Sequence, residues 1–295
     1  MLDARFLTAM ITPFDAHDRV DHDEAARIAR YLVDGGCDGL VVAGTTGESP
    51  ALEHDEKIAL FETVAKAVRG RAAVVAGTGG NNTAHSVALT REAAAVGVDG
   101  ILAVVPYYNK PTQDGMLRHF GAIAGATELP VIVYNIPART GTNMQPATLR
   151  ELARRHATIV GVKESSGDLA QISTILAERA DGFRVWSGDD HLMLAVLAAG
   201  GDGVVSVAAH VVGLRMREML DAFDRGDMPV AGAIHRELTP VFAALFATTS
   251  PIPVKWAMNE FGFAAGPPRS PLGEMPAELA ARLRPMLARY RTQTA

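Results

Sequence analysis

Residues 131–163 read VIVYNIPARTGTNMQPATLRELARRHATIVGVK, and this stretch decides the fold class. Its ends, Val131–Pro137 and Ile159–Lys163, are short apolar runs rich in β-branched residues, as expected of strands that are buried on both faces. Between them, Pro146–Arg155 has the apolar spacing of a helix that buries one face. Two buried strands joined by a crossover helix run parallel, so the stretch predicts one βαβ unit.

The same alternation of strand-like and helix-like runs extends over most of the chain. The expected strands are Leu7–Pro13, Gly39–Thr45, Ala72–Gly77, Gly100–Pro106, Val131–Pro137, Ile159–Lys163, Arg184–Ser187 and Gly203–Ala208. Helical patterns are Asp23–Val33, His54–Arg69, Thr83–Val96, Gln113–Ala126, Pro146–Arg155, Asp168–Ala180 and His191–Ala199. Eight such strands predict an α/β fold, a closed (β/α)8 TIM barrel. The competing doubly wound sheet would normally carry a glycine fingerprint after its first strand, where this chain has Thr12-Pro13-Phe14.

Only helical patterns follow the eighth expected strand. They are Leu214–Phe223, Met228–Ala247, Val254–Phe261 and Ala277–Tyr290. We therefore divide the chain into a (β/α)8 barrel, residues 1–210, and residues 211–295, which hold the final barrel helix and a C-terminal helical appendage of the same domain. The length of 295 residues suits a barrel with such an appendage.

Composition narrows the classes of partner. The net charge is −5, so neither nucleic acid nor an anionic membrane is expected to bind. A single cysteine, Cys37, excludes a disulfide framework within the chain and favours a reducing compartment. No apolar stretch is long enough for a bilayer span and the first residues do not resemble a signal peptide, so we expect a cytoplasmic protein. The histidines have no spacing typical of a metal site, and no metal is expected.

Lys163 is the residue that suggests chemistry. Ile159-Val160-Gly161-Val162 carries it to the carboxyl end of the sixth expected strand, which is the end where barrel enzymes have their active sites. Lysine is rarely buried without a reason. Burial disfavours its ammonium form and leaves an amine that can attack a ketone and form a Schiff base. The alternative is a strand-end lysine whose ammonium group reaches solvent.

Tyr134 strengthens this interpretation. It is the fourth residue of Val131-Ile132-Val133-Tyr134, as Lys163 is the fourth residue of Val160-Gly161-Val162-Lys163, so the two side chains should lie at matching depth on neighbouring strands. A phenol beside an amine can relay protons while the Schiff base forms. The alternative is a tyrosine packed in the core with its hydroxyl group satisfied.

Two loops offer groups that suit a carboxylate. Arg139 follows Tyr134 in the chain, and its planar guanidinium can grip a carboxylate through two hydrogen bonds. Thr45 and Thr46 lie on a turn between two glycines, where backbone N–H groups can bind an anion. In isolation, a solvated loop arginine would be the favoured explanation of Arg139, and ordinary turn chemistry is the alternative for the two threonines.

Six motifs, in order over nearly the whole chain, resemble the signatures of the dihydrodipicolinate synthase family. They are GTTGES at 44–49, PYYNKP at 106–111, YNIPARTG at 134–141, GVKE at 161–164, SGDD at 187–190 and PIPVKWA at 251–257. The wider superfamily, which includes N-acetylneuraminate lyase and sugar-acid aldolases and dehydratases, shares the Gly-Thr-Thr-Gly-Glu motif, the tyrosine and the lysine. Arg139 in its Pro-x-Arg-Thr-Gly context is the more specific sign of the synthases.

The resemblance implies a reaction in lysine and diaminopimelate biosynthesis. Lys163 would condense with pyruvate, and the resulting enamine would attack the aldehyde of L-aspartate 4-semialdehyde. Attack by the substrate's own amine would then free Lys163 and close the ring of 4-hydroxy-tetrahydrodipicolinate. The enzyme would be a lyase that needs no cofactor beyond this covalent Schiff base.

The resemblance also implies roles for further residues. Thr46 and Tyr134 would form a proton relay with Tyr108 from a neighbouring subunit, so the protein would be a homo-oligomer, in this family usually a homotetramer that is a dimer of dimers. Arg139 would bind the carboxylate of the second substrate. The residues expected around pyruvate are Thr45 and Thr46 at its carboxylate, and the backbones of Gly188 and Val205.

Many family members are inhibited by lysine at a dimer-interface site. Residues that match this site are Ser49, His54, Asn81 and Tyr107. However, Lys57 stands where lysine-sensitive members often carry histidine, and His85 where they often carry glutamate. An added cation and a lost carboxylate would repel the ammonium groups of an incoming lysine. Feedback inhibition is therefore expected to be weak or absent.

Three alternatives remain at this point. The first is another pyruvate-dependent lyase, or a sugar-acid aldolase or dehydratase, on the same Schiff-base scaffold; Arg139 argues against it. The second is a non-catalytic keto-acid-binding protein, which would be expected to have lost Lys163, Tyr134 or Thr46. The third is a metal-dependent aldolase, for which the sequence offers no ligand set.

Overall fold

The computed structural model describes residues 3–291, and its centre is a closed barrel of eight parallel strands. Each strand pairs with the next in the chain, and the last pairs with the first. The strands are β1 (Phe6–Ala9), β2 (Gly39–Val42), β3 (Ala73–Gly77), β4 (Gly100–Val104), β5 (Val131–Asn135), β6 (Ile159–Glu164), β7 (Arg184–Ser187) and β8 (Gly203–Ser206). The predicted (β/α)8 barrel is confirmed.

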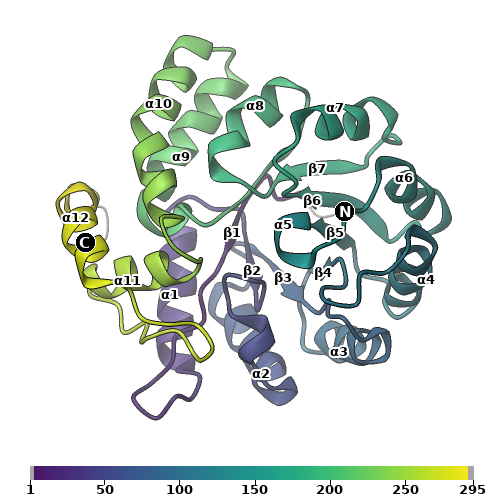
Figure 1. Ribbon diagram of the computed structural model, residues 1–295, viewed down its shortest axis with the longest axis horizontal. Coiled ribbons are helices and arrows are strands. Elements are labelled where there is room, and N and C mark those ends of the chain that lie inside the picture. Colours follow the sequence, from purple (N-terminus) through teal and green to yellow (C-terminus); the bar gives the residue numbers. More distant parts are fainter. Residues whose placement is uncertain (1–2, 292–295) are drawn as a thin grey trace.

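Helices surround the barrel, as Figure 1 shows in a view along its strands. The barrel helices are α1 (His22–Asp34), α2 (His54–Val68), α3 (Thr83–Ala95), α4 (Gln113–Ala124), α6 (Pro146–Arg155), α7 (Leu169–Glu178), α8 (Met193–Ala198) and α9 (Ala209–Asp224). Several begin where the sequence offers a capping side chain: Asp21, Asn82, Thr112 and Asp168 each accept a backbone N–H bond from the first turn of the helix that follows.

Side chains fill the inside of the barrel and leave its carboxyl end for polar groups. An apolar cluster inside the strands includes Leu7, Val41, Leu102 and Trp186. The Trp186 indole donates a hydrogen bond to the Ala4 carbonyl (3.0 Å). Gly161 leaves room for this ring, because a methyl group added there would lie 2.6 Å from the indole carbon Cζ3. Two residues further along the same strand, the chain reaches Lys163 on the same face.

Most of the strands end earlier than their apolar runs predict. For the runs Leu7–Pro13 and Gly39–Thr45 the strands have only four residues each, and the residues that follow are mostly buried but lie outside the strands. Ala43 already has a left-handed φ of 51°. Its carbonyl oxygen would lie 2.3 Å from a methyl group added at Gly77, so the backbones of these two loops cross closely. The residues just after each of these strands are buried at the barrel rim, so the sequence stays apolar beyond the last paired residue. The length of the apolar run therefore overestimates the length of the strand.

The C-terminal helices lie along one side of the barrel. Besides α9 they are α10 (Met228–Leu245), α11 (Ile252–Glu260) and α12 (Ala277–Ala288), and Figure 1 shows α11 beside α1 and α12 further out. The final barrel helix starts at Ala209, two residues before the expected division, because the Ser206 hydroxyl accepts the Ala209 N–H. In residues 3–291, no helix combines the length and apolar character needed to cross a bilayer.

Candidate active site

Lys163 and Tyr134 lie side by side at the carboxyl end of the barrel. They are register partners on β6 and β5, and the Lys163 Nζ lies 4.1 Å from the centroid of the Tyr134 ring. The lysine is only 5% exposed and the tyrosine 4%. The predicted neighbourhood of amine and phenol is confirmed, and the alternative of a lysine reaching bulk solvent is wrong.

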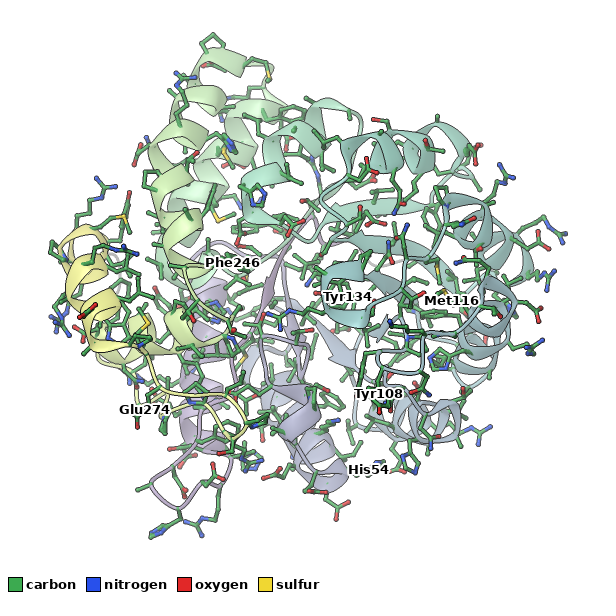
Figure 2. The ribbon with its side chains drawn as sticks, in the orientation of Figure 1. His54, Tyr108, Met116, Tyr134, Phe246 and Glu274 are labelled. Atoms are coloured by element: carbon green, nitrogen blue, oxygen red, sulfur yellow. The ribbon has the colours of Figure 1, made fainter. Side chains whose placement is uncertain are left out.

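A cavity of about 220 Å³ opens beside Tyr134. Most of its lining is apolar or backbone, with a few polar side chains that converge on it, which is the usual character of a small-molecule site. The polar residues along it are Thr45, Ser49, Tyr107, Tyr134, Arg139 and Thr140. Figure 2 shows Tyr134 near the middle of the barrel, behind the short helix α5 (Pro137–Thr140).

The two adjacent threonines of the β2 loop occupy different environments. Thr45 is half-buried and lines the cavity. Thr46 is buried and is not among the residues that line it. The loop is held tightly: the Thr12 hydroxyl donates to the Gly47 carbonyl (2.7 Å), and the Ser49 N–H donates to the Gly44 carbonyl (3.2 Å). Because the two threonines are adjacent in the sequence, the sequence alone did not show which of them lines the cavity.

Gly188 borders Lys163 directly. A methyl group added at this glycine would lie 3.0 Å from the Lys163 Cε and 1.7 Å from the Ser165 Oγ. The Ser165 hydroxyl is buried and has no hydrogen-bond partner within the described residues, which is unusual for a buried polar group. Sequence reasoning missed Ser165, although it follows Lys163 at the spacing of two that puts both on the same face of a strand. Val205 is buried inside the barrel on β8.

Arg139 lies in helix α5 rather than in a loop. Pro137 starts this short helix, and Gly141 ends it with a left-handed φ of 72°. Arg139 lines the cavity, and the Nη2 of its guanidinium donates a hydrogen bond to the Ser250 carbonyl (3.1 Å). The arginine is therefore oriented by a residue from the C-terminal part of the chain.

Tyr108 points away from the barrel of its own chain. It is 88% exposed and has a left-handed φ of 69°, an uncommon backbone conformation for a tyrosine. Figure 2 shows it among the helices at the rim, on the side of α3, whereas Tyr134 lies near the barrel centre. Within one chain, the structure does not bring these two phenols together.

Two acidic residues near Lys163 were not predicted. Glu164 faces the other side of β6, where Asn135 Nδ2 donates to both carboxylate oxygens (3.1 Å each) and the Ser166 N–H donates to one (2.8 Å). Burial raises the pKa of Glu164, although these hydrogen bonds oppose the shift. Burial also raises the pKa of Asp189, while the electrostatic influence of His191 and Lys163 acts to lower this pKa.

The residues of the expected lysine-effector site are spread along the rim. Ser49 and Tyr107 line the cavity, and burial raises the pKa of the Tyr107 phenol. His54 is exposed and its Nε2 pairs with Glu92 (2.9 Å). The remaining members are Lys57, whose pKa burial lowers; Asn81, whose carbonyl accepts a bond from Asn109; and His85, which is exposed.

The fold and the site together define a class of protein. A closed parallel barrel that buries a lysine amine against a phenol, at the carboxyl ends of its strands, is an enzyme scaffold for Schiff-base chemistry. Within residues 3–291, no three His, Cys, Asp or Glu side chains gather closely enough to hold a metal ion.

Comparison with known proteins gives the family. A profile of the Dihydrodipicolinate synthetase family matches residues 3–289, and the chain belongs to this family. The 4-hydroxy-tetrahydrodipicolinate synthase of Moorella thermoacetica is 58% identical over 268 residues, which are 91% of each chain. The dihydrodipicolinate synthase of Bacillus anthracis superposes with a TM-score of 0.95 at 42% identity, covering 98% of this chain and 99% of that one. The lysine-bound enzyme of Cyanidioschyzon merolae gives the same score and identity over 99% of both chains.

Proposed function

We propose that this chain condenses pyruvate with L-aspartate 4-semialdehyde to 4-hydroxy-tetrahydrodipicolinate, through a Schiff base on Lys163. The chain is a lyase of lysine and diaminopimelate biosynthesis, as its relatives at 50–58% identity are named for this reaction. The observation that carries the assignment of Lys163 is its burial against Tyr134, which lines the cavity.

We assign side chains of the site to the steps of this reaction. The Lys163 amine attacks the pyruvate ketone, whose oxygen leaves as water after protonation. The imine then loses a proton from the pyruvate methyl group and becomes an enamine. The former methyl carbon of this enamine bonds to the aldehyde carbon. Tyr134, whose ring face lies against the amine, supplies and accepts these protons through its hydroxyl group. Arg139, on the cavity lining, binds the carboxylate of the aldehyde substrate. The amine of the substrate finally displaces Lys163.

A coupled assay with pyruvate and aspartate semialdehyde tests this proposal. Turnover of this pair should exceed turnover of N-acetylneuraminate or 2-keto-3-deoxy acids by orders of magnitude, because we propose that Arg139, which lines the cavity, binds a second carboxylate. Preferred cleavage of a sugar acid would instead support the related lyases. Binding of pyruvate without any turnover would support a keto-acid-binding protein.

The two threonines should respond differently to valine. The sequence assigned the relay hydroxyl to Thr46, whereas the cavity contact of Thr45 supports Thr45 for that role. We expect Thr45→Val to lower kcat by about 100-fold, a typical loss when a proton-transfer group is removed. Thr46→Val should raise the KM for pyruvate and change kcat less than about tenfold. Steady-state kinetics of the two variants test this assignment. A larger loss of kcat in Thr46→Val than in Thr45→Val would contradict the assignment of Thr45 to the relay.

We further propose that the enzyme acts as a homo-oligomer, at least a dimer and in the form of a tetramer. The exposed Tyr108 side chain with its strained backbone supports a role in a neighbouring subunit, where its phenol would complete the relay with Tyr134. No cofactor beyond the covalent Schiff base is proposed. The free, buried Cys37 supports a cytoplasmic location.

Added L-lysine should inhibit this enzyme weakly or not at all. Lys57 places a cation within the matched effector residues, and His85 supplies no carboxylate for a ligand ammonium group. We expect activity to be retained in millimolar lysine. Half-inhibition at submillimolar lysine would contradict the expectation. The double variant Lys57→His/His85→Glu is the matched comparison and should gain sensitivity to lysine.

A further inference from the structure

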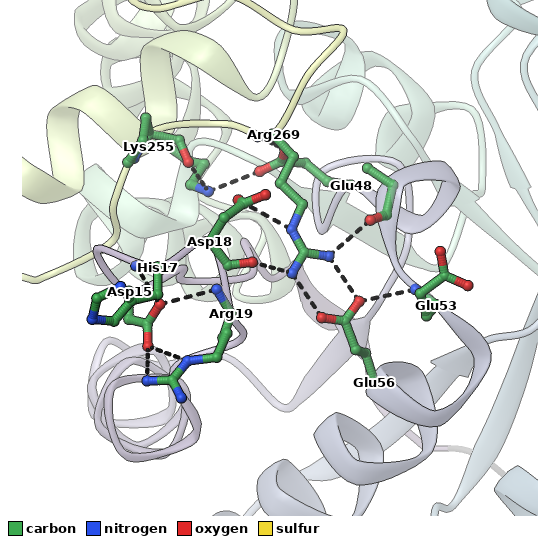
Figure 3. Close-up of polar contacts among 11 residues, drawn as sticks. Asp15, His17, Asp18, Arg19, Glu48, Glu53, Glu56, Lys255 and Arg269 are labelled. Atoms are coloured by element: carbon green, nitrogen blue, oxygen red, sulfur yellow. Dashed lines mark hydrogen bonds and ion pairs between the residues drawn. The ribbon is translucent and has the colours of Figure 1, made fainter.

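A fully buried ion pair joins the C-terminal part of the chain to the β2 loop. The Lys255 Nζ lies 2.8 Å from the Glu48 Oε1, and the two side chains are 0% and 1% exposed. The same ammonium donates to the Pro267 carbonyl (3.0 Å) and lies 4.1 Å from the centroid of the Phe14 ring. Figure 3 shows this contact between α11 and the loop. Two oxygen acceptors and one aromatic ring of the protein thus surround the ammonium.

Glu48 is the residue that ends the threonine turn. It follows Thr45-Thr46-Gly47 and has a left-handed φ of 58°. Its second carboxylate oxygen accepts the backbone N–H of Arg269 (2.8 Å). The Arg269 guanidinium also donates to the Ala51 carbonyl (2.8 Å), shortly after this turn, and to both Glu56 oxygens (2.7 Å each) in the first turn of α2. Figure 3 shows the hydrogen bonds and ion pairs of this guanidinium.

The same part of the chain also holds Arg139. Ser250, whose carbonyl accepts the Arg139 guanidinium, stands just before α11. Lys255 lies in the first turn of α11, and its backbone N–H donates to the Pro251 carbonyl (3.0 Å). One turn of helix therefore connects the contact on Arg139 with the contact on Glu48. We call Ser250, Lys255 and Arg269 the C-terminal brace.

Stability alone does not explain such a pair. Removing two charges from water is costly, and a buried ion pair is often no more stabilising than apolar residues of the same size. Such a pair does select one arrangement of the groups it joins, since any other arrangement leaves a buried charge unpaired. Here the pair joins α11 to the loop that carries Thr45, and Ser250, just before α11, holds Arg139. Thr45 and Arg139 both line the cavity.

We infer that Lys255 is a positioning residue, which through Glu48 and the C-terminal brace fixes the distance between the threonine loop and Arg139. This inference rests on the proposed function, because that function assigns the threonine loop to pyruvate and Arg139 to the aldehyde substrate. The brace would then align the enamine on Lys163 with the aldehyde, without contact to either. Misalignment in a two-substrate step is costly, because the rate depends strongly on the placement of the reacting atoms.

The double variant Glu48→Gln/Lys255→Met tests this inference, because it removes both charges and keeps the side-chain shapes. We expect its melting temperature to stay within a few degrees of the parent. With saturating pyruvate alone, borohydride should still trap the adduct on Lys163 to the same extent. In the complete reaction, kcat should fall by about tenfold or more, with a smaller change in the KM for pyruvate.

Controls separate positioning from general destabilisation. Arg217→Met breaks an ion pair with Asp38 at the opposite end of the barrel and should leave kcat unchanged. Arg269→Met keeps the backbone bond to Glu48 but loses the contacts with Ala51 and Glu56, so it should lower kcat by a few-fold. If the double variant does not fold, the kcat of Arg269→Met tests the inference in its place.

Two results would overturn the inference. One is a folded double variant with the kcat of the parent, which would make the ion pair purely structural. The other is an equal loss of adduct trapping and of turnover, which would place the effect on Lys163 itself. Failure of the unmodified protein to form any adduct would instead overturn the proposed function, so the two failures are distinguishable.

Discussion

Replacing Lys163 with methionine should reduce turnover by a factor on the order of 1,000 or more, and should abolish covalent capture of pyruvate. Among residues 3–291, the Lys163 amine is the only one over the Tyr134 ring, and methionine fills the same buried space without a group that can form an imine. Loss of a nucleophile removes the covalent route altogether, so the effect exceeds that of any positioning residue. Mass spectrometry after borohydride reduction with pyruvate measures the adduct directly.

Lys66→Met is the matched control for this variant. Lys66 lies on α2, where its exposed ammonium pairs with Glu62 (2.7 Å) one helical turn away. Surface pairs of this kind contribute little to stability, so its kinetics and adduct should match those of the parent. An adduct that persisted in Lys163→Met, at another lysine, would contradict the assignment of the nucleophile.

Gly188→Ala should lower kcat/KM by about 100-fold, through a single added methyl group. That group would overlap the Ser165 Oγ at 1.7 Å and would press on the Lys163 Cε at 3.0 Å. Relief requires the serine to rotate or the lysine to move, and a displacement of the reacting amine by a fraction of an ångström misaligns it with the ketone. Single-turnover trapping with pyruvate should show a slowed imine formation, because the displaced group is the nucleophile.

The double variant Gly188→Ala/Ser165→Gly distinguishes the two contacts. It removes the Ser165 hydroxyl and so leaves only the pressure on Lys163. We expect part of the activity to return, and Ser165→Gly alone should cost much less than Gly188→Ala. Parent-like kinetics of Gly188→Ala, in a correctly folded protein, would show that the space at this glycine is not needed for the reaction.

The sequence by itself determined the fold and the central pair of the site. Eight apolar runs that alternate with helical patterns leave a closed parallel barrel as the simplest solution, because strands buried on both faces need helices around them. The matching positions of Tyr134 and Lys163 in adjacent strands fixed their neighbourhood, since side chains alternate with a period of two along a strand. Both are local patterns, which a sequence displays directly.

Only the tertiary structure decided what surrounds this pair. It put Thr45 rather than Thr46 on the cavity, and it placed Ser165 against Gly188. It also joined Lys255 to Glu48 across a separation of 207 residues, and Ser250 to Arg139 across 111. These contacts depend on how distant segments pack on the barrel rim, and neither periodicity nor spacing along the chain encodes such packing.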